Sequence, residues 1–322
     1  MVRSPDRTAD SDPGSTGAAS TGPVSTSAAP HGVAVIDKPA AWTSHDVVAK
    51  CRGVLGTRKV GHSGTLDPAA TGVLVLGVGK ATRLLRFLAE LPKTYLGEIV
   101  LGVETSTLDA DGEISATHDM SAVTEDQVRA AALSFVGPIM QVPPMVSAVK
   151  VGGRRLYELA REGKEVERRP RAVEVFRCEL EPVVGEAGVW RCEVECSSGT
   201  YIRSLAADLG AALGGGAHLR SLRRVAVGGF TIDEATSVDS PVLRPLSDAV
   251  GHLDACVVSD EVAVRVSHGQ VLEQNVLMVG EQDEGPWAVL NPVGELLAVY
   301  GPSRGLAKPM VVISDTGAPR TL

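Results

Sequence analysis

The segment from Lys59 to Leu74 contains one carboxylate, Asp67, among three glycines and two threonines. Glycine-rich loops can bring their backbone close to a ligand. Pro68 disfavours helical backbone at Asp67, so the carboxylate should lie on an extended or turn segment that the apolar run after Thr71 anchors as a strand. A catalytic carboxylate and an ordinary Asp-Pro turn are the two interpretations of this pattern.

A second segment with unusual chemistry, Cys196 to Gly210, joins an expected strand to an expected helix. Thr200 can cap that helix, which places Arg203 in its first turn. A cation at a helix N-terminus opposes the helix dipole, so we expect Arg203 to have a role beyond helix stability. The alternative is a surface arginine that pairs with Asp208 or has no partner.

Other patterns point to ordinary structure. Gly77 to Lys80 resembles part of a phosphate loop but lacks its spacing, so a turn from strand to helix is expected. The acidic segment from Thr107 to Gly112 has no calcium-loop continuation and should also be a turn. No pattern specifies a nucleophilic Ser or Cys triad. The five cysteines include no Cys-x-x-Cys pair, and Cys192 and Cys196 should be buried on one strand face, so we expect neither disulfides nor a metal site.

The elements that would position these groups mix helices and strands without a regular βαβ period, which favours an α+β architecture over a doubly wound sheet. The residue patterns predict strands over 32–37, 94–101, 171–180 and 188–197, and helices over 82–91 and 200–213, with Ser44 as the N-cap of an earlier helix. After about residue 240, short apolar runs between Gly and Asn turns predict strands over 261–266, 287–290 and 296–300 in a small β-barrel.

The expected organisation is a tail over 1–30, a main domain over 31–240 and a C-terminal domain over 241–322. The tail has almost no large apolar side chains and should be disordered. No apolar run approaches the roughly 20 residues that span a bilayer, and the N-terminus does not resemble an export signal. We therefore expect a cytoplasmic protein with no membrane segment.

The formal charge of −8 is unfavourable for binding a polyanion, but it is unevenly distributed. Residues 232–322 hold 13 acidic and 5 basic residues, a balance of −8, so the first 231 residues are neutral overall. Two stretches among them are basic: one comprises Lys150, Arg154, Arg155, Arg161, Lys164, Arg168, Arg169 and Arg171, and the other Arg220, Arg223 and Arg224. They indicate either a polyanion-binding surface or a solvated face paired with nearby glutamates.

Six ordered blocks resemble the TruB family of pseudouridine synthases, over roughly residues 32–230. They are Lys38-Pro39 with Trp42 to Val48, the loop from Gly61 to Leu74, Lys93-Thr94-Tyr95, Pro143-Pro144 with Ser147 to Lys150, Cys196 to Gly210, and Gly216 to Leu219 with Leu222 to Arg224. The chain departs from the family pattern at Ala41, where Gly is frequent, at Val146, where Tyr is frequent, and at Ser106, where Asp is common. The C-terminal region resembles the family's PUA-like RNA-binding barrel loosely.

The resemblance implies a monomeric enzyme, without cofactor or metal, that isomerises uridine 55 in the T loop of tRNA. In that reaction the base is detached, turned and rejoined through C5, so nothing enters from outside. It implies Asp67 as the catalytic carboxylate, Tyr95 as the aromatic packed on the target base, and Arg203 as a partner that lowers the pKa of Asp67. The implied substrate contacts are His62, Tyr201 and Leu222 around the base, and Arg220, Arg223, Arg224 and Lys150 on phosphates.

Two other functions compete with this one. The first is a noncatalytic protein of the same fold that binds or folds tRNA. The second is a nucleosidase or glycosidase that uses Asp67, which would need a second acidic group for the leaving base or sugar. No such group lies near Asp67 in the sequence.

Overall fold

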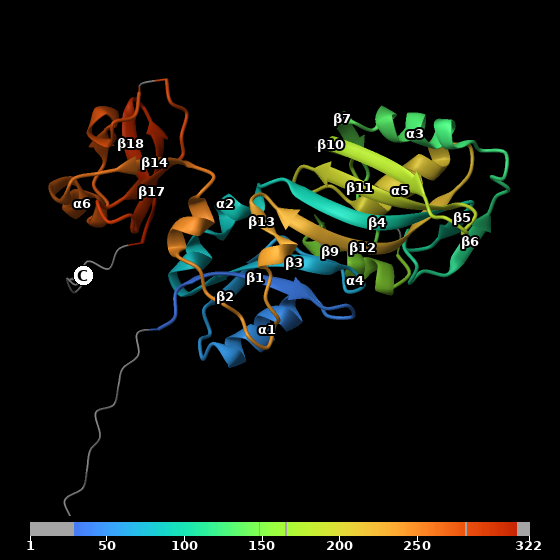
Figure 1. The fold of residues 1–322 in the computed structure, drawn as a ribbon, viewed down its shortest axis with the longest axis horizontal. Coiled ribbons are helices and arrows are strands. Elements are labelled where there is room, and N and C mark those ends of the chain that lie inside the picture. Colours follow the sequence, from blue (N-terminus) through green and yellow to red (C-terminus); the bar gives the residue numbers. More distant parts are fainter. Residues whose placement is uncertain (1–28, 148, 165, 281, 314–322) are drawn as a thin grey trace, which may run out of the picture.

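The computed structural model describes residues 29–147, 149–164, 166–280 and 282–313, without the side chains of Lys150, Tyr157 and Arg161. All but the last two residues of the expected tail lie outside this part of the chain. The described residues form a large mixed sheet with helices on it and a smaller sheet at one end (Figure 1). None of their helices is long and apolar enough to cross a membrane.

The large sheet has nine strands, and its main path runs β1-β3-β12-β4-β11-β10-β7, with β2 beside β3 and β13 beside β12. Only β12 and β3 pair in parallel, so the sheet is mixed, which agrees with the predicted α+β architecture. The strands are β1 (Gly32–Lys38), β2 (Val60–Ser63), β3 (Thr71–Val78), β4 (Lys93–Leu101), β7 (Gly137–Gln141), β10 (Arg171–Pro182), β11 (Val189–Cys196), β12 (Ala217–Val227) and β13 (Phe230–Thr231). Predicted strands over 32–37, 94–101, 171–180 and 188–197 are all confirmed.

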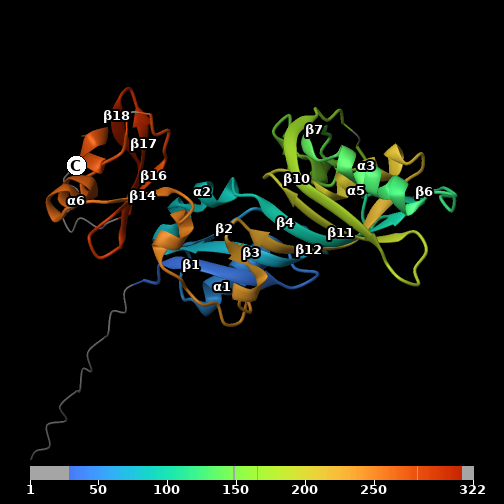
Figure 2. The ribbon, with the colours of Figure 1, turned by 45° about the horizontal axis from the view of Figure 1, so that its top comes forward.

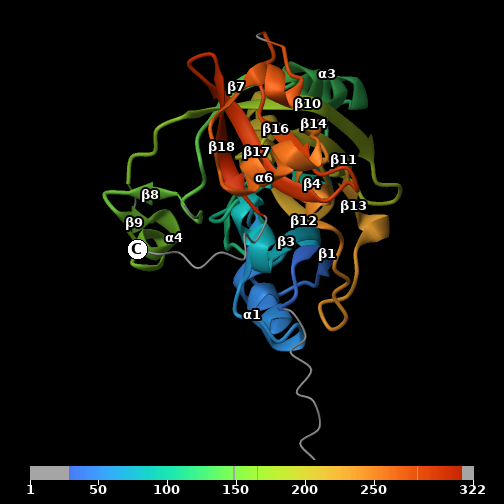
Figure 3. The same ribbon diagram turned by 90° about the vertical axis from the view of Figure 1, so that its left-hand side faces the viewer.

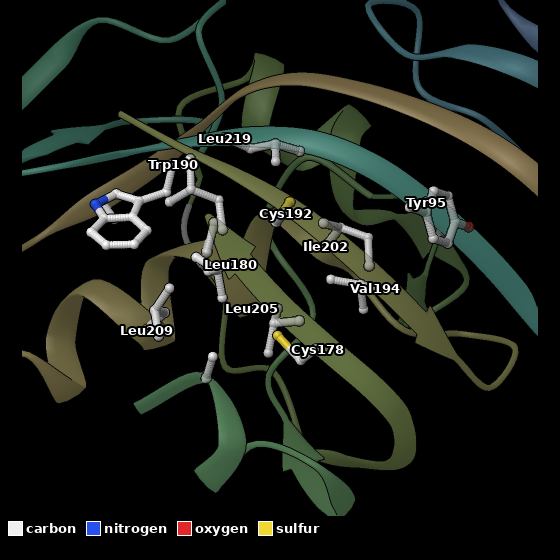
Figure 4. Close-up of a cluster of buried hydrophobic side chains, with 14 of the residues drawn as sticks. Tyr95, Cys178, Leu180, Trp190, Cys192, Val194, Ile202, Leu205, Leu209 and Leu219 are labelled. Atoms are coloured by element: carbon white, nitrogen blue, oxygen red, sulfur yellow. The ribbon is translucent and has the colours of Figure 1, made fainter. Parts of the chain in front are cut away.

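The two halves of this sheet have separate cores. Helix α1 (Ser44–Val54) packs near β2, whereas α3 (Glu125–Ser134) and α5 (Ile202–Ala212) pack against β10 and β12 (Figure 2). Figure 4 shows the core under α5, in which Leu205 and Leu209 face the strand residues Leu180 and Trp190. Cysteines 178, 192 and 196 belong to this core, as predicted for the last two.

The predictions of two helix caps and one strand were wrong. The N-cap of α1 is Thr43, not Ser44, because Thr43 and Asp46 form a reciprocal capping box. The cap of α5 is Tyr201, and the Thr200 hydroxyl instead donates to the Ser197 carbonyl. Residues 261–266 are not a strand: α6 (Asp260–Ser267) begins at a Ser259 cap, and this local hydrogen bonding prevails over the alternating valines.

Short elements connect the strands. The predicted helix over 82–91 is divided into a 3₁₀ turn, η1 (Gly79–Arg83), and α2 (Leu85–Ala89). Strands β5 (Val103–Thr105) and β6 (Ile114–Thr117) form a hairpin at the end opposite the C-terminal sheet. Strands β8 (Lys150–Val151) and β9 (Arg154–Arg155) and helix α4 (Leu156–Arg161) form a projection beside the large sheet (Figure 3).

Residues 232–250 pack against the large sheet. They include the turns η2 (Ile232–Glu234) and η3 (Leu246–Val250). The backbone N–H of Thr236 donates to Val35 at 2.9 Å and that of Arg244 to Val33 at 2.8 Å, so this segment lies along β1.

The smaller sheet begins at Asp254 and has the order β14-β16-β17-β18-β15, a half-barrel. Its elements are β14 (Asp254–Val257), β15 (Leu272–Glu273), η4 (Gln274–Leu277), β16 (Trp287–Leu290), β17 (Leu296–Ser303) and β18 (Leu306–Val312). One apolar cluster joins both sheets, since Val33 and Phe87 share it with Val299 and Val311.

Candidate active site

A cavity of about 280 Å³ opens between the Asp67 loop and the first turn of α5. Its volume lies near the lower end of small-ligand sites, about 300–1,000 Å³. Five of the predicted site residues line it together with Lys93 and Ser147: Asp67, Tyr95, Tyr201, Arg203 and Arg224. The structure therefore brings together groups from five separate parts of the chain.

The loop that carries Asp67 is fixed on both sides of the carboxylate. The buried Ser44 hydroxyl accepts from the Leu66 N–H at 2.9 Å and donates to the Leu66 carbonyl at 3.3 Å. The fully buried Lys38 ammonium donates to the Pro68 carbonyl at 3.1 Å, and the Ala41 N–H donates to the same oxygen at 2.9 Å. Position 41 has a φ of 64°, a left-handed backbone in which glycine is least strained.

We expect Ser44→Ala to destabilise the protein by about 1–3 kcal/mol, because it leaves the buried N–H and carbonyl of Leu66 without this partner. Thermal unfolding measures the loss. Ser134→Ala is the matched control, since that hydroxyl is exposed and donates only to the Ala131 carbonyl within its own helix end. Equal melting temperatures for Ser44→Ala and wild type would contradict the proposed anchoring of the loop.

Arg203 is buried and forms ion pairs with two carboxylates. Its Nη2 lies 2.8 Å from Asp67 Oδ2 and its Nη1 lies 3.2 Å from Asp109 Oδ2. The guanidinium also donates to the carbonyls of Thr107 at 3.1 Å and Val146 at 2.9 Å. This network explains a cation in the first turn of α5, because the arginine serves the site and not the helix.

Sequence reasoning missed Asp109, which it placed in an ordinary turn. The segment is a turn, and Leu108 within it has a left-handed φ of 62°. The Thr107 hydroxyl donates to the Asp109 carboxylate, and the Thr105 hydroxyl donates to the Asp109 carbonyl at 2.6 Å. Two threonines and a left-handed residue are the local signals that this carboxylate has a fixed direction.

The substitution at Ser106 lies outside the cavity. Its side chain is exposed, and its hydroxyl accepts from the Glu113 N–H at 3.2 Å. Ser106 therefore closes the β5–β6 turn, and the acidic partner of Arg203 in this segment is Asp109.

Burial raises the pKa of Asp67 above its usual value, and this effect exceeds the lowering by Arg203. Asp109 raises the pKa further, while Lys38 lowers it. Arg203 lowers the pKa of Asp67, as predicted, but the raising effects of burial and Asp109 outweigh the lowering effects of Arg203 and Lys38, so the net pKa is raised. The carboxylate nevertheless faces the cavity, with 43% of its side chain exposed.

Tyr95 on β4 forms another part of the cavity wall at the edge of the core under α5 (Figure 4). Its side chain is 8% exposed, and burial raises the pKa of its hydroxyl, which lies near Arg224. Tyr201 is held by Gln141, whose amide accepts from the Tyr201 N–H at 2.8 Å and donates to its carbonyl at 3.0 Å.

The three arginines expected on phosphates lie in three different environments. Arg224 is 1% exposed and donates to the carbonyls of Val73 at 2.8 Å and Gly64 at 3.3 Å, so it belongs to the cavity wall and not to an outer RNA surface. Arg220 pairs with Glu98 and Glu186. Arg223 pairs with Asp37 at 2.7 Å.

Two of the remaining predicted contacts, His62 and Leu222, do not line the cavity. His62 is on β2, packs edge-on against His45 with ring centroids 5.5 Å apart, and has a lowered pKa because it is partly buried. Leu222 lines a neighbouring surface hollow with Thr71 and packs against the core that contains Tyr95. The side chain of Lys150 lies outside the described residues.

No cluster of three or more His, Cys, Asp or Glu side chains suited to a metal ion is present within the described part of the chain. The groups that face the cavity are a carboxylate, two arginines, a lysine, hydroxyls and glycine backbone. These side chains can position a substrate in the cavity and can donate protons to it or accept protons from it.

Two family descriptions match the chain. Residues 52–202 match the TruB family pseudouridylate synthase N-terminal domain, and residues 203–264 match the tRNA pseudouridylate synthase B C-terminal domain. A tRNA pseudouridine synthase B of Thermobifida fusca (strain YX) is 45% identical over 297 residues, which cover 88% of this chain and 99% of the relative. One from Arthrobacter sp. (strain FB24) is 43% identical, with coverage of 88% and 97%.

Two solved structures also resemble this chain. An H/ACA RNP bound to a substrate RNA that contains 2'-deoxyuridine matches with a TM-score of 0.66 and 25% identity, over 88% of this chain and 85% of that one. A Cbf5-Nop10-Gar1 complex matches with a TM-score of 0.65 and 27% identity, over 88% and 84%.

Proposed function

The chain belongs to the TruB family of pseudouridylate synthases and is an isomerase that forms pseudouridine in tRNA, and we propose that its target is uridine 55 in the T loop, with Asp67 as the catalytic carboxylate. The observation that carries the assignment of Asp67 is its contact with the buried Arg203 at the edge of the Tyr95 cavity. Arg203 fixes the direction of the carboxylate, which a substrate in the cavity would meet directly.

The reaction breaks the bond between N1 of uracil and C1' of ribose and forms a bond between C5 and C1'. Asp67 acts as its ionised form, either by attacking C1' or by accepting the C2' proton. The C5 proton is lost and N1 gains a proton, so atoms and electrons balance without a cofactor. Tyr95 and the apolar part of the wall hold the detached base away from water.

A base within the T loop must leave its stack before it can reach this cavity, and the protein offsets the cost of unstacking with contacts to the flipped base. The cavity volume suits one nucleoside. Asp109 pairs with the far side of Arg203 and does not line the cavity, so it offers no acid to a leaving sugar or base. This geometry favours isomerisation over the nucleosidase reaction, which needs that second acid.

Incubation of the protein with an unmodified tRNA transcript, followed by mapping of pseudouridine at single-nucleotide resolution, tests the proposal. We expect modification at position 55 and none in a transcript with cytidine there. Binding without modification would indicate a noncatalytic tRNA-binding protein, and release of free uracil would indicate a nucleosidase.

We expect Arg169 and Arg171, and not Arg220, to contact the tRNA backbone. Both are exposed beside the β8–α4 projection and have no ion pair with a described residue, whereas two glutamates neutralise Arg220. Arg169→Gln and Arg171→Gln should each flatten the slope of log affinity against log salt by about 0.7–0.9. Arg220→Gln is the control with an unchanged slope. A flatter slope for Arg220→Gln alone would reverse this assignment.

The rate should fall as pH falls through the raised pKa of Asp67, because the protonated carboxyl can neither attack C1' nor accept a proton. The acidic limb of kcat/KM should therefore lie above pH 3.8, the usual pKa of the group. Asp109→Asn removes one cause of the raised pKa and should move this limb to lower pH. A limb that moves to higher pH in this variant would contradict the assignment to Asp67.

A further inference from the structure

The cavity wall contains two buried cations that form no ion pair with a carboxylate of the described residues. Arg203 shares its charge between Asp67 and Asp109. Lys93 and Arg224, which are 4% and 1% exposed, have no ion pair among the described residues. Burying a charge without an opposite charge is costly, so a site that keeps two such cations gains from an anionic ligand.

The two cations meet at one point of the wall. Gly64 has a φ of 81°, and a Cβ added there would lie 3.6 Å from Arg224 Nη1 and 3.9 Å from Lys93 Cε. Glycine therefore leaves both cations close to its open face, and Gly64, Lys93 and Arg224 all line the cavity. Gly72 has a φ of 100° and allows β3 to pair with β12 at Arg224, which fixes that arginine's backbone.

Each cation retains N–H groups for a ligand. The Lys93 ammonium donates to the carbonyls of Ala89 at 2.6 Å and Leu91 at 2.5 Å, which leaves the third of its three donors. Arg224 uses Nε and Nη2 on the carbonyls of Val73 and Gly64 and also lies within hydrogen-bonding reach of the Tyr95 hydroxyl, and its Nη1 lies beside the open face of Gly64.

The nearby titratable groups leave this charge positive at neutral pH. The pKa of Lys93 is lowered to about 8, chiefly by burial and then by Arg224. The Cys196 thiol, with a pKa raised to about 11 by burial, is neutral, and Glu90 acts to raise the pKa of Lys93. The Tyr95 hydroxyl is also neutral because burial raises its pKa.

We propose that Lys93 and Arg224 are further catalytic residues that stabilise the uracil anion after its bond to ribose breaks, an inference that rests on the proposed function. The electron pair of the C1'–N1 bond leaves with the base and spreads over N1, O2 and O4. This holds whether Asp67 attacks C1' or removes the C2' proton. When C5 bonds to C1', the pair returns to the sugar and the anion disappears, so the cations act during the time the base is free to turn.

Removing one fixed hydrogen-bond donor that faces the charge developing in a reaction lowers the rate by about 10²–10³-fold. Lys93→Met and Arg224→Gln should each lower the single-turnover rate on uridine tRNA by about that factor. The same measurement can be made on a tRNA with 5-fluorouridine at the target position. In both cases the tRNA is digested, and the disappearance of the original target nucleoside is followed with time. Fluorine stabilises the uracil anion even when the protein's cations are removed. The loss of rate caused by each substitution should therefore be about tenfold smaller on the 5-fluorouridine tRNA.

Lys38→Met is the matched control, because Lys38 is an equally buried lysine whose ammonium donates to three carbonyls, including that of Pro68 beside Asp67. It acts by positioning the loop, so its loss should be the same on both tRNAs. Equal losses on both tRNAs for Lys93→Met and Arg224→Gln would assign them a structural role only and overturn the proposal.

Titration of the intact wild-type protein tests the same idea when a variant fails to fold. At pH 7, where Lys93 is still mainly protonated, 5-nitrouracil is an anion and uracil is neutral, and we expect the anion to bind about tenfold more tightly. Equal or weaker binding of the anion would overturn the cation pair. Absence of pseudouridine from wild-type reactions would instead contradict the proposed function, and the titration still decides whether the cavity selects an anion.

Discussion

Asp67→Asn is expected to lower pseudouridine formation by about 10⁴-fold or more, while tRNA affinity stays within about tenfold of wild type. Asparagine has nearly the same shape but cannot be ionised, so it can neither attack C1' nor accept the C2' proton. The affinity should persist because phosphate and base contacts, not the carboxylate, hold the RNA. Single-turnover conversion and filter binding measure the two quantities separately.

The variant should stay folded, because Arg203 keeps Asp109 and two carbonyls as partners when the Asp67 charge is removed. Asp111→Asn is the control for loss of a carboxylate, since that side chain is exposed two residues beyond Asp109. It should retain the wild-type rate. Conversion by Asp67→Asn at a rate comparable to wild type would exclude the assigned role.

The elements around the cavity could be predicted from local patterns. Alternation over 94–101, 171–180 and 188–197 marks strands because one face of each is buried, and the structure has β4, β10 and β11 there. The helix after Thr200 could be predicted from its apolar spacing. Tyr95 lies near the start of β4 and Arg203 in the first turn of α5, whereas Asp67 lies in the loop between β2 and β3. Local patterns do not bring these three residues together, and their grouping was implied only by the family resemblance.

The ion pair with Asp109 could not be predicted from sequence, because it depends on a contact between segments far apart in the chain. Asp109 reaches Arg203 because the turn after β5 lies along β12, with the Ala110 N–H donating to Leu219 at 3.0 Å. From the local sequence alone, the segment from Thr107 to Gly112 can be recognised only as a polar turn.

The basic stretch on β12 illustrates a second limit. In sequence Arg220, Arg223 and Arg224 form one cluster, but successive side chains of a strand point to opposite faces. Register shifts between Leu219 and Ser221 and between Arg224 and Ala226 change the facing further. Arg224 therefore faces the core side, while its neighbours pair with surface carboxylates.

A third limit is competition between local signals. Residues 261–266 alternate valines as a strand does, yet Ser259 accepts from the Val262 N–H and two acidic residues follow it. A cap and acidic first turn each add to helix stability, and Val266 is then buried against the smaller sheet. The pattern alone does not reveal which signal is stronger.

Arg203→Gln is expected to reduce both stability and the rate at saturating tRNA. Removing one partner of a buried ion pair costs about 3–5 kcal/mol, and the cost should be lower here because Asp67 is 43% exposed. The rate should fall by about 10³-fold, since Asp67 loses its only ion-pair partner among the described residues and two carboxylates then face each other without a cation. Thermal unfolding and single-turnover conversion measure these losses.

Adding Asp109→Asn to Arg203→Gln should separate the two effects. The second change removes one uncompensated carboxylate, so the double variant should regain part of the lost stability, and the two stability changes should not be additive. The rate should not recover, because Asp67 still lacks the guanidinium that fixes its direction.

Arg203→Lys tests that geometry further. It keeps the charge, but an ammonium cannot reproduce the planar fork that reaches both carboxylates and two carbonyls, so the rate of this variant should also remain low. Arg220→Gln, in an exposed ion pair, should change stability by no more than about 0.5 kcal/mol. Additive losses of stability, or a double variant that recovers the wild-type rate, would mean that Arg203 does not position Asp67.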